Sequence, residues 1–136
     1  MIRLVLPWPP SANRYWRHPT RGPLAGRHLI SVEGRAYRVA VQGVVLEQLR
    51  RRPLLSCPLK VTFECAPPDR RTRDLSNLLK AAEDSLTHAG VWLDDKLIDH
   101  GEQIRRLPIP GGLLVAWIDV AAPLVALNLE PLRQAA

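Results

Sequence analysis

The chain has 136 residues, of which 46% are hydrophobic and 24% are charged, and its net charge is +6. This composition is typical of one folded domain and excludes an intrinsically disordered chain. No apolar run approaches the roughly 20 residues that a membrane-spanning helix needs, so no membrane partner is expected. We therefore expect a single domain over residues 1–136, with a tail of uncertain structure from 121 to 136.

The first half of the chain predicts a strand, a long loop and a helix. Residues 2–6 are a short apolar run, which indicates a strand. Residues 7–30 contain five prolines and four arginines, and a loop of that length in a compact domain is usually functional or mobile. Ser31 suits the N-cap of a helix that runs to about Arg51, because apolar side chains recur at three- and four-residue steps between them.

The second half predicts a strand, a helix and two further strands. Residues 58–65 alternate between apolar and polar side chains, the pattern of a half-buried strand. A helix is expected over 75–88, where leucine and alanine form one apolar stripe. Residues 96–108 and 112–121 read as two strands that form a hairpin around a Pro-Gly-Gly turn. The order β-α-β-α-β-β predicts an α+β fold, a mixed sheet covered by two helices.

Two cysteines, Cys57 and Cys65, are too few for a disulfide framework or a zinc cluster. They lie eight residues apart in a segment that is expected to be extended, so they cannot easily pair. Reduced cysteines are typical of a cytoplasmic protein, and we expect that location.

The charge is divided unevenly along the chain. Residues 1–56 contain ten arginines and two acids and have a net charge of +8, whereas residues 83–102 have a net charge of −5. Arginine outnumbers lysine by sixteen to three, and its planar guanidinium suits two-pronged pairing with phosphate. A basic region beside an acidic one is typical of metal-dependent enzymes acting on nucleic acid. Chance clustering of charged residues gives the same pattern, so charge alone does not decide whether the protein binds nucleic acid.

Polar residues of the second helix form the first candidate site. Ser76, Lys80 and Asp84 follow each other at four-residue steps and are expected to share one face. Each has a plain structural explanation, as does Asp74, which suits an N-cap, and Asp95, which suits a turn. Together, however, two carboxylates and a lysine suit phosphodiester hydrolysis with magnesium. We expect Asp74 and Asp95 to converge on the ion, with Lys80 leaning into the same pocket.

Three separate motifs occur along the chain. The one nearest the C-terminus has two parts: the charged loop and second helix read DRRTRDLSNLLKAA over 69–82, and GVWLDD follows over 90–95. The opening reads LPWPPSANRYWRH over 6–18, and SVEGRAYR begins the first helix over 31–38. Across residues 3–121 these motifs resemble the RusA family of Holliday junction resolvases.

The resemblance implies a small homodimeric endonuclease, encoded by a bacterium or a phage, that depends on Mg²⁺ or alternatively on Mn²⁺. Such enzymes resolve four-way DNA junctions by paired symmetric nicks in recombination and repair. A two-fold dimer suits this task because a junction has near two-fold symmetry. By motif match, the expected catalytic residues are Asp74, Lys80 and Asp95. The expected DNA contacts come from the two arginine-containing loops and the second helix: Arg14, Arg17, Arg70, Arg71, Arg73 and Asn77.

Position 76 departs from the family pattern, which has an aspartate there. The expected metal ligands are thus Asp74, Asp95 and Ser76, and a hydroxyl is a weaker ligand than a carboxylate for a hard cation. Three outcomes are open. Ser76 binds the metal directly or through water, and activity is kept. Alternatively, another acid supplies the missing charge, or the protein binds junctions and cleaves them poorly. The other acids considered are Asp84, Asp94 and Asp99. We favour retained activity, because both expected aspartates and the lysine are present.

Overall fold

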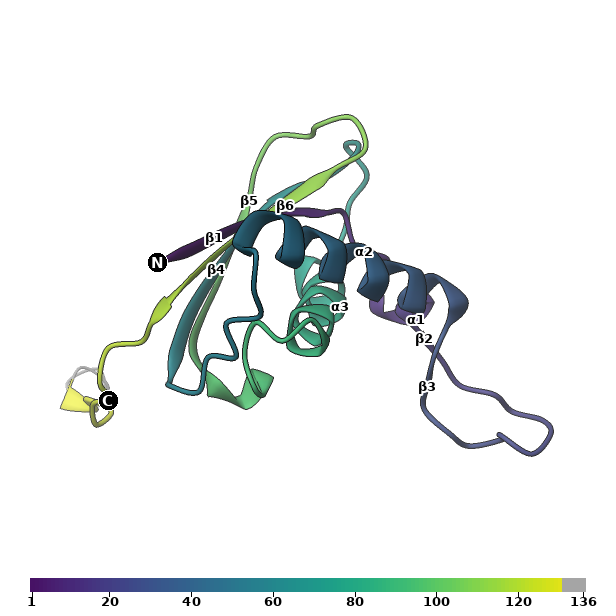
Figure 1. The fold of residues 1–136 in the computed structure, drawn as a ribbon, viewed down its shortest axis with the longest axis horizontal. Coiled ribbons are helices and arrows are strands. Elements are labelled where there is room, and N and C mark those ends of the chain that lie inside the picture. The colour runs from purple at the N-terminus through teal and green to yellow at the C-terminus, as the bar shows by residue number, and fades with distance from the viewer. Residues whose placement is uncertain (131–136) are drawn as a thin grey trace.

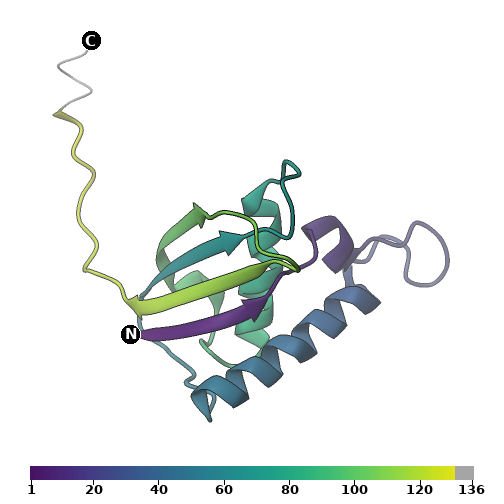
Figure 2. The ribbon, with the colours of Figure 1, turned by 90° about the horizontal axis from the view of Figure 1, so that it is seen from above.

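The computed structural model describes residues 1–130 and contains one four-stranded mixed sheet with two long helices on one face (Figures 1 and 2). The strand order is β1-β6-β4-β5; β6 is antiparallel to both of its neighbours, and β4 and β5 are parallel. This arrangement confirms the predicted α+β class. The main elements are β1 (Ile2–Pro7), α2 (Val32–Leu49), β4 (Leu59–Ala66), α3 (Leu75–His88), β5 (Ile98–Arg105) and β6 (Leu113–Val120).

The segment 7–30 is not one continuous loop, and that prediction was wrong. It contains α1 (Ala12–Tyr15) and a two-residue strand pair, β2 (Trp16–Arg17) with β3 (Leu29–Ile30). Ser31 ties these short elements to the start of α2, because its hydroxyl accepts the backbone N–H of Gly34 and donates to the carbonyl of Tyr15 at 3.0 Å. Residues 18–28, called the arm here, extend away from the body of the protein between β2 and β3 (Figure 1).

The predicted hairpin between the last two strands was also wrong. β5 and β6 do not pair with each other, because β4 lies between them. The reason is their different polarity. β6 buries alternate apolar side chains and takes a central place, whereas β5 is polar along most of its length and occupies the edge, where only one side needs a partner strand.

The hydrophobic core lies between the helical face of the sheet and the two helices. The predicted alternation in β4 is confirmed, since Leu59, Val61, Phe63 and Cys65 are all buried. Trp92, just after α3, is fully buried as well and donates its indole N–H to Thr87 at 2.6 Å. This packing fixes α3 against β4 and the edge strand β5, so the polar side of α3 faces outward beside that edge.

Three smaller expectations concern the cysteines, the tail and the membrane. Cys57 and Cys65 are both free thiols, as predicted. From Ala121 the chain leaves the sheet and runs away from it (Figure 2), and residues 131–136 of the tail lie outside the described part. Within residues 1–130, no helix has the length and apolar character needed to cross a membrane.

Candidate active site

The N-terminus of α3 is organised by two aspartates. Asp74 is the N-cap, as the sequence predicts, and its carboxylate accepts a hydrogen bond from the backbone N–H of Ser76 at 3.0 Å. In the loop before it, Asp69 pairs with Arg73 at 2.7 Å and accepts the backbone N–H of Arg71 at 2.9 Å. These contacts lower the pKa of Asp69 to about 2, with the Arg73 hydrogen bond the largest cause. Asp69 thus holds the arginine loop in place.

Beside this helix end lies a cleft of about 430 Å³, called the basic cleft here. Four of the six predicted DNA contacts line it, together with Asp74, and Trp8 and Pro68 form part of its wall. Arg17, on β2, and Arg70, which is exposed in the loop, are not among the lining residues. The predicted DNA contacts that the cleft brings together are Arg14, Arg71, Arg73 and Asn77.

A second cavity, of about 330 Å³, lies between α3 and the edge strand and is called the α3–β5 pocket here. Ser76 and Lys80 line it, which confirms that these two residues share a face. The Ser76 hydroxyl accepts a hydrogen bond from the Gln103 amide at 3.2 Å, so β5 contributes a polar wall. The floor is apolar and comes from Val61, Phe63 and Leu79.

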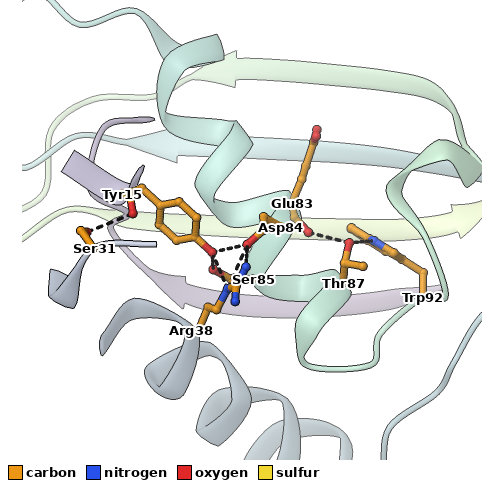
Figure 3. A network of polar contacts seen from close by, with 8 residues as sticks. All are labelled: Tyr15, Ser31, Arg38, Glu83, Asp84, Ser85, Thr87 and Trp92. Carbon is orange, nitrogen blue, oxygen red and sulfur yellow. Dashed lines mark hydrogen bonds and ion pairs between the residues drawn. The ribbon is translucent and has the colours of Figure 1, made fainter. Parts of the chain in front are cut away.

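Asp84 does not share the face of Ser76 and Lys80, and that prediction was wrong. Its carboxylate accepts two hydrogen bonds from Arg38, at 2.6 and 3.0 Å, and one from the Tyr15 hydroxyl (Figure 3). We call Tyr15, Arg38 and Asp84 the brace, because they join α1, α2 and α3. Eight residues along a helix turn by about 80° beyond two full turns, which carries Asp84 away from Ser76 and toward α2.

Glu83 is the residue that the sequence interpretation missed. It lines the α3–β5 pocket with Ser76 and Lys80. The signal was present, since seven residues are close to two full helical turns and return nearly to the same face. Figure 3 shows the Glu83 side chain pointing away from the brace, while its neighbour Asp84 points into it.

Asp95 lies in the one-turn helix η1 (Asp95–Leu97), which packs against α3. Asp94 caps this turn by accepting the backbone N–H of Lys96 at 2.9 Å, whereas Asp95 is exposed. Burial raises the pKa of Glu83 above its ordinary value, the charge of Asp95 raises it further, and Lys80 opposes the change. Asp95 therefore lies close enough for its charge to act on the Glu83 carboxyl.

The donors around this site fit magnesium, although their geometry is not that of an assembled metal centre. Within residues 1–130, no three Asp, Glu, His or Cys side chains form a group that could hold a metal ion. The convergence of Asp74 and Asp95 stays a prediction. All candidate donors are hard oxygen atoms, which Mg²⁺ prefers: the Ser76 hydroxyl and the carboxylates of Asp74, Glu83 and Asp95.

Comparison with known proteins identifies the family of the chain. The family described as Endodeoxyribonuclease RusA matches residues 7–105. That stretch includes the basic cleft, α3 with its pocket, and the brace. The chain belongs to this endodeoxyribonuclease family.

Curated relatives extend the match over most of the chain. A protein named crossover junction endodeoxyribonuclease RusA from Shigella sonnei is 46% identical over 110 residues, which cover 80% of this chain and 85% of that protein. The protein of the same name from Escherichia coli strain K12 is 44% identical over the same shares. An equally named protein of Enterobacteria phage 82 is also 44% identical over those shares.

Proposed function

We propose that this protein is a Mg²⁺-dependent endonuclease that resolves four-way DNA junctions by paired, symmetric nicks. Its setting would be DNA recombination and repair in the cytoplasm of a bacterium, with a phage or prophage origin. The names of the relatives support the junction as substrate. The observation that carries the proposal is that the two cavities lie next to each other at the start of α3. Asp74 lines the basic cleft, Ser76 lines the α3–β5 pocket, and one hydrogen bond links them.

In the proposed mechanism, the basic cleft binds the DNA backbone. Arg14, Arg71 and Arg73 line the same cleft as Asp74, and arginine pairs with phosphate through two parallel hydrogen bonds. Asp69 holds Arg73 in one orientation, which reduces the side-chain entropy lost on binding. Because a strand bound in the cleft passes the start of α3, its phosphate comes next to the residues of the pocket.

The N-cap of α3, the helix η1 and the pocket together supply the chemical groups. Asp74 and Asp95 would hold the metal ion, which on binding neutralises developing negative charge and lowers the pKa of a bound water. Lys80 would bind a non-bridging oxygen of the scissile phosphate and stabilise the charge that grows there in the transition state. Ser76 and Gln103 form a neutral hydrogen-bonded pair that orients water on the edge-strand side.

A homodimer completes the proposal. One chain offers one basic cleft and one α3–β5 pocket, whereas paired nicking needs two sites related by a two-fold axis. The arm, with its arginines and its position away from the body of the protein, is available to reach a second DNA arm of the junction.

The test is incubation of the purified protein with an end-labelled four-way junction, with Mg²⁺ and with EDTA. We expect nicks at symmetric positions on two opposed strands with Mg²⁺ only, and little cutting of a linear duplex of the same sequence. Junction affinity should fall steeply with salt, because phosphate contacts release counterions. Tight binding without nicks across several junction sequences would instead favour a junction-binding protein that Ser76 has made a poor catalyst.

A further inference from the structure

We propose that Glu83 is a metal-binding carboxylate of this site and supplies, with Asp95, the negative charge that Ser76 does not. This inference rests on the proposed magnesium-dependent function and adds a residue to it. Its first support is position. Glu83 lines the α3–β5 pocket together with Ser76 and Lys80, and its side chain points away from the brace (Figure 3).

The second support is that the Glu83 carboxylate is free. Within the described residues it takes part in no hydrogen bond or ion pair; only the backbone carbonyl of Glu83 is used, accepting from the Thr87 hydroxyl at 2.9 Å. The side chain is half-buried above the apolar floor of the pocket. A half-buried carboxylate loses part of its hydration and here gains no hydrogen bond from the described residues in return, a cost that a bound cation would offset.

The third support is that neighbouring acids are already engaged. Asp84 belongs to the brace. Glu102 also lines the pocket, but its carboxylate contacts His100 at 2.8 Å and Thr62 at 3.4 Å. Asp94 accepts the Lys96 backbone N–H. Of the two acids that line the pocket, Glu83 is thus the one whose carboxylate remains available.

The chemistry of the pocket agrees with a divalent cation. Ser76 and Gln103 contribute neutral oxygen atoms on one side, and Glu83 contributes a charged one on the other. Lys80 lies between them on the same helix face, and its charge only partly offsets the repulsion between Glu83 and Asp95. Mg²⁺ commonly takes one or two carboxylates and keeps several waters, and a pocket of about 330 Å³ has room for such a hydrated ion.

The direct test measures metal binding without DNA. Mn²⁺ binding to the full chain is followed by electron paramagnetic resonance of the free ion and by calorimetry, for the wild type and for Glu83→Gln. We expect a loss of affinity of roughly 10- to 100-fold, the range that even residues supporting a metal ligand commonly cost. Glu102→Gln is the matched control, because it makes the same charge change at the other acid that lines the pocket, whose carboxylate is already held by His100. Its affinity should stay close to that of the wild type.

A second variant tests the compensation itself. Ser76→Asp in the Glu83→Gln background returns one carboxylate to the pocket, and we expect it to restore most of the Mn²⁺ affinity. In junction nicking, Glu83→Gln should raise the Mg²⁺ concentration needed for half-maximal rate, and the double variant should lower it again. Thermal unfolding of each variant without metal shows whether the fold is intact.

The outcomes separate this inference from the proposed function. If the wild type nicks junctions while Glu83→Gln matches it in both Mn²⁺ affinity and Mg²⁺ requirement, Glu83 is no ligand and the endonuclease proposal stands. If the wild type neither binds Mn²⁺ nor nicks junctions, both proposals are overturned. If Glu102→Gln loses as much Mn²⁺ affinity as Glu83→Gln, the loss reflects the net negative charge of the pocket and not metal ligation by Glu83. That result would also overturn the inference.

Discussion

The two sides of α3 have different roles: one lines the α3–β5 pocket and the other belongs to the brace. The neighbours Glu83 and Asp84 show this difference most clearly. Glu83 faces an open pocket and has no ion-pair partner among residues 1–130, whereas Asp84 accepts hydrogen bonds from Arg38 and Tyr15 (Figure 3). The brace side is satisfied and holds three helices together. On the pocket side, the Glu83 carboxylate and the Lys80 ammonium have no protein partner among the described residues and are open to a ligand. Adjacent acids of equal charge thus have unequal roles because the helix turns one of them inward.

The largest effect should come from Asp74→Asn at the N-cap of α3, where Asp74 is hydrogen-bonded to the backbone of the pocket residue Ser76. We expect the nicking rate to fall by about 100-fold or more, since a charged group at the metal is lost. Junction affinity should remain or increase, because a repulsion against phosphate is removed. Asparagine also caps helices well, so the free energy of unfolding should change by only a few tenths of a kcal/mol. A quenched junction-nicking assay and urea unfolding measure the two quantities, and nicking at the wild-type rate would exclude Asp74 from the site.

The next largest effect belongs to the brace side. Asp84→Asn removes the charge opposite Arg38, whose side chain is only 20% exposed. We expect the free energy of unfolding to fall by about 2 kcal/mol, because a partly buried guanidinium loses its ionic partner. Urea unfolding followed by circular dichroism measures this change. Unchanged stability would show that the brace contributes nothing to the fold.

A smaller effect is expected in the basic cleft. Arg71→Ala should weaken junction binding by roughly a few-fold and reduce the slope of log affinity against log salt by about 1, the value for one lost phosphate contact. Arg51→Ala, just beyond the C-terminal end of α2, is the control with the same charge change. Fluorescence anisotropy at several salt concentrations measures both. Equal slopes for the two variants would place the DNA somewhere other than the cleft.

The smallest effect concerns the order of the arginine loop. The pKa of Asp69 lies at about 2, below the ~3.9 of an unfolded chain, because Arg73 and a backbone N–H stabilise its charge. The sign follows: this contact stabilises the folded state above about pH 4 and is lost as the pH falls through 2. A carbon-detected NMR titration of Asp69 should therefore give a midpoint near 2 in the folded protein. A midpoint near 4, the value expected in urea, would mean that the loop is not held.

Local patterns were enough to predict much of the fold and part of the site. Helix 75–88, the alternation in β4 and the Asp74 cap all follow from side chains within a few residues. The pairing of β5 with β4 could not be predicted in this way. It depends on which strand exposes the least apolar surface when it occupies the edge of the sheet. The short elements in the segment 7–30 depend on Ser31, whose contacts with the α1 region span about 16 residues.

The same limit explains the error on the polar face of α3. From spacing alone, Glu83 and Asp84 are both candidates to join Ser76 and Lys80. Arg38, which draws Asp84 to the other side, lies 46 residues away in the sequence. Only the packing of α2 against α3 shows that it is near. Long-range partners of this kind decide the role of an acid, and spacing within one helix does not reveal them.

The most direct test of the division between the two sides compares Lys80→Ala with Asp84→Asn in one experiment. Both variants are measured for urea unfolding and for the rate of four-way junction nicking with Mg²⁺. We predict that Lys80→Ala keeps wild-type stability and loses about 100-fold or more in rate, whereas the folded fraction of Asp84→Asn keeps nicking while its stability falls. A Lys80→Ala protein that nicks like the wild type, or an Asp84→Asn protein that is as stable as the wild type, would contradict the account.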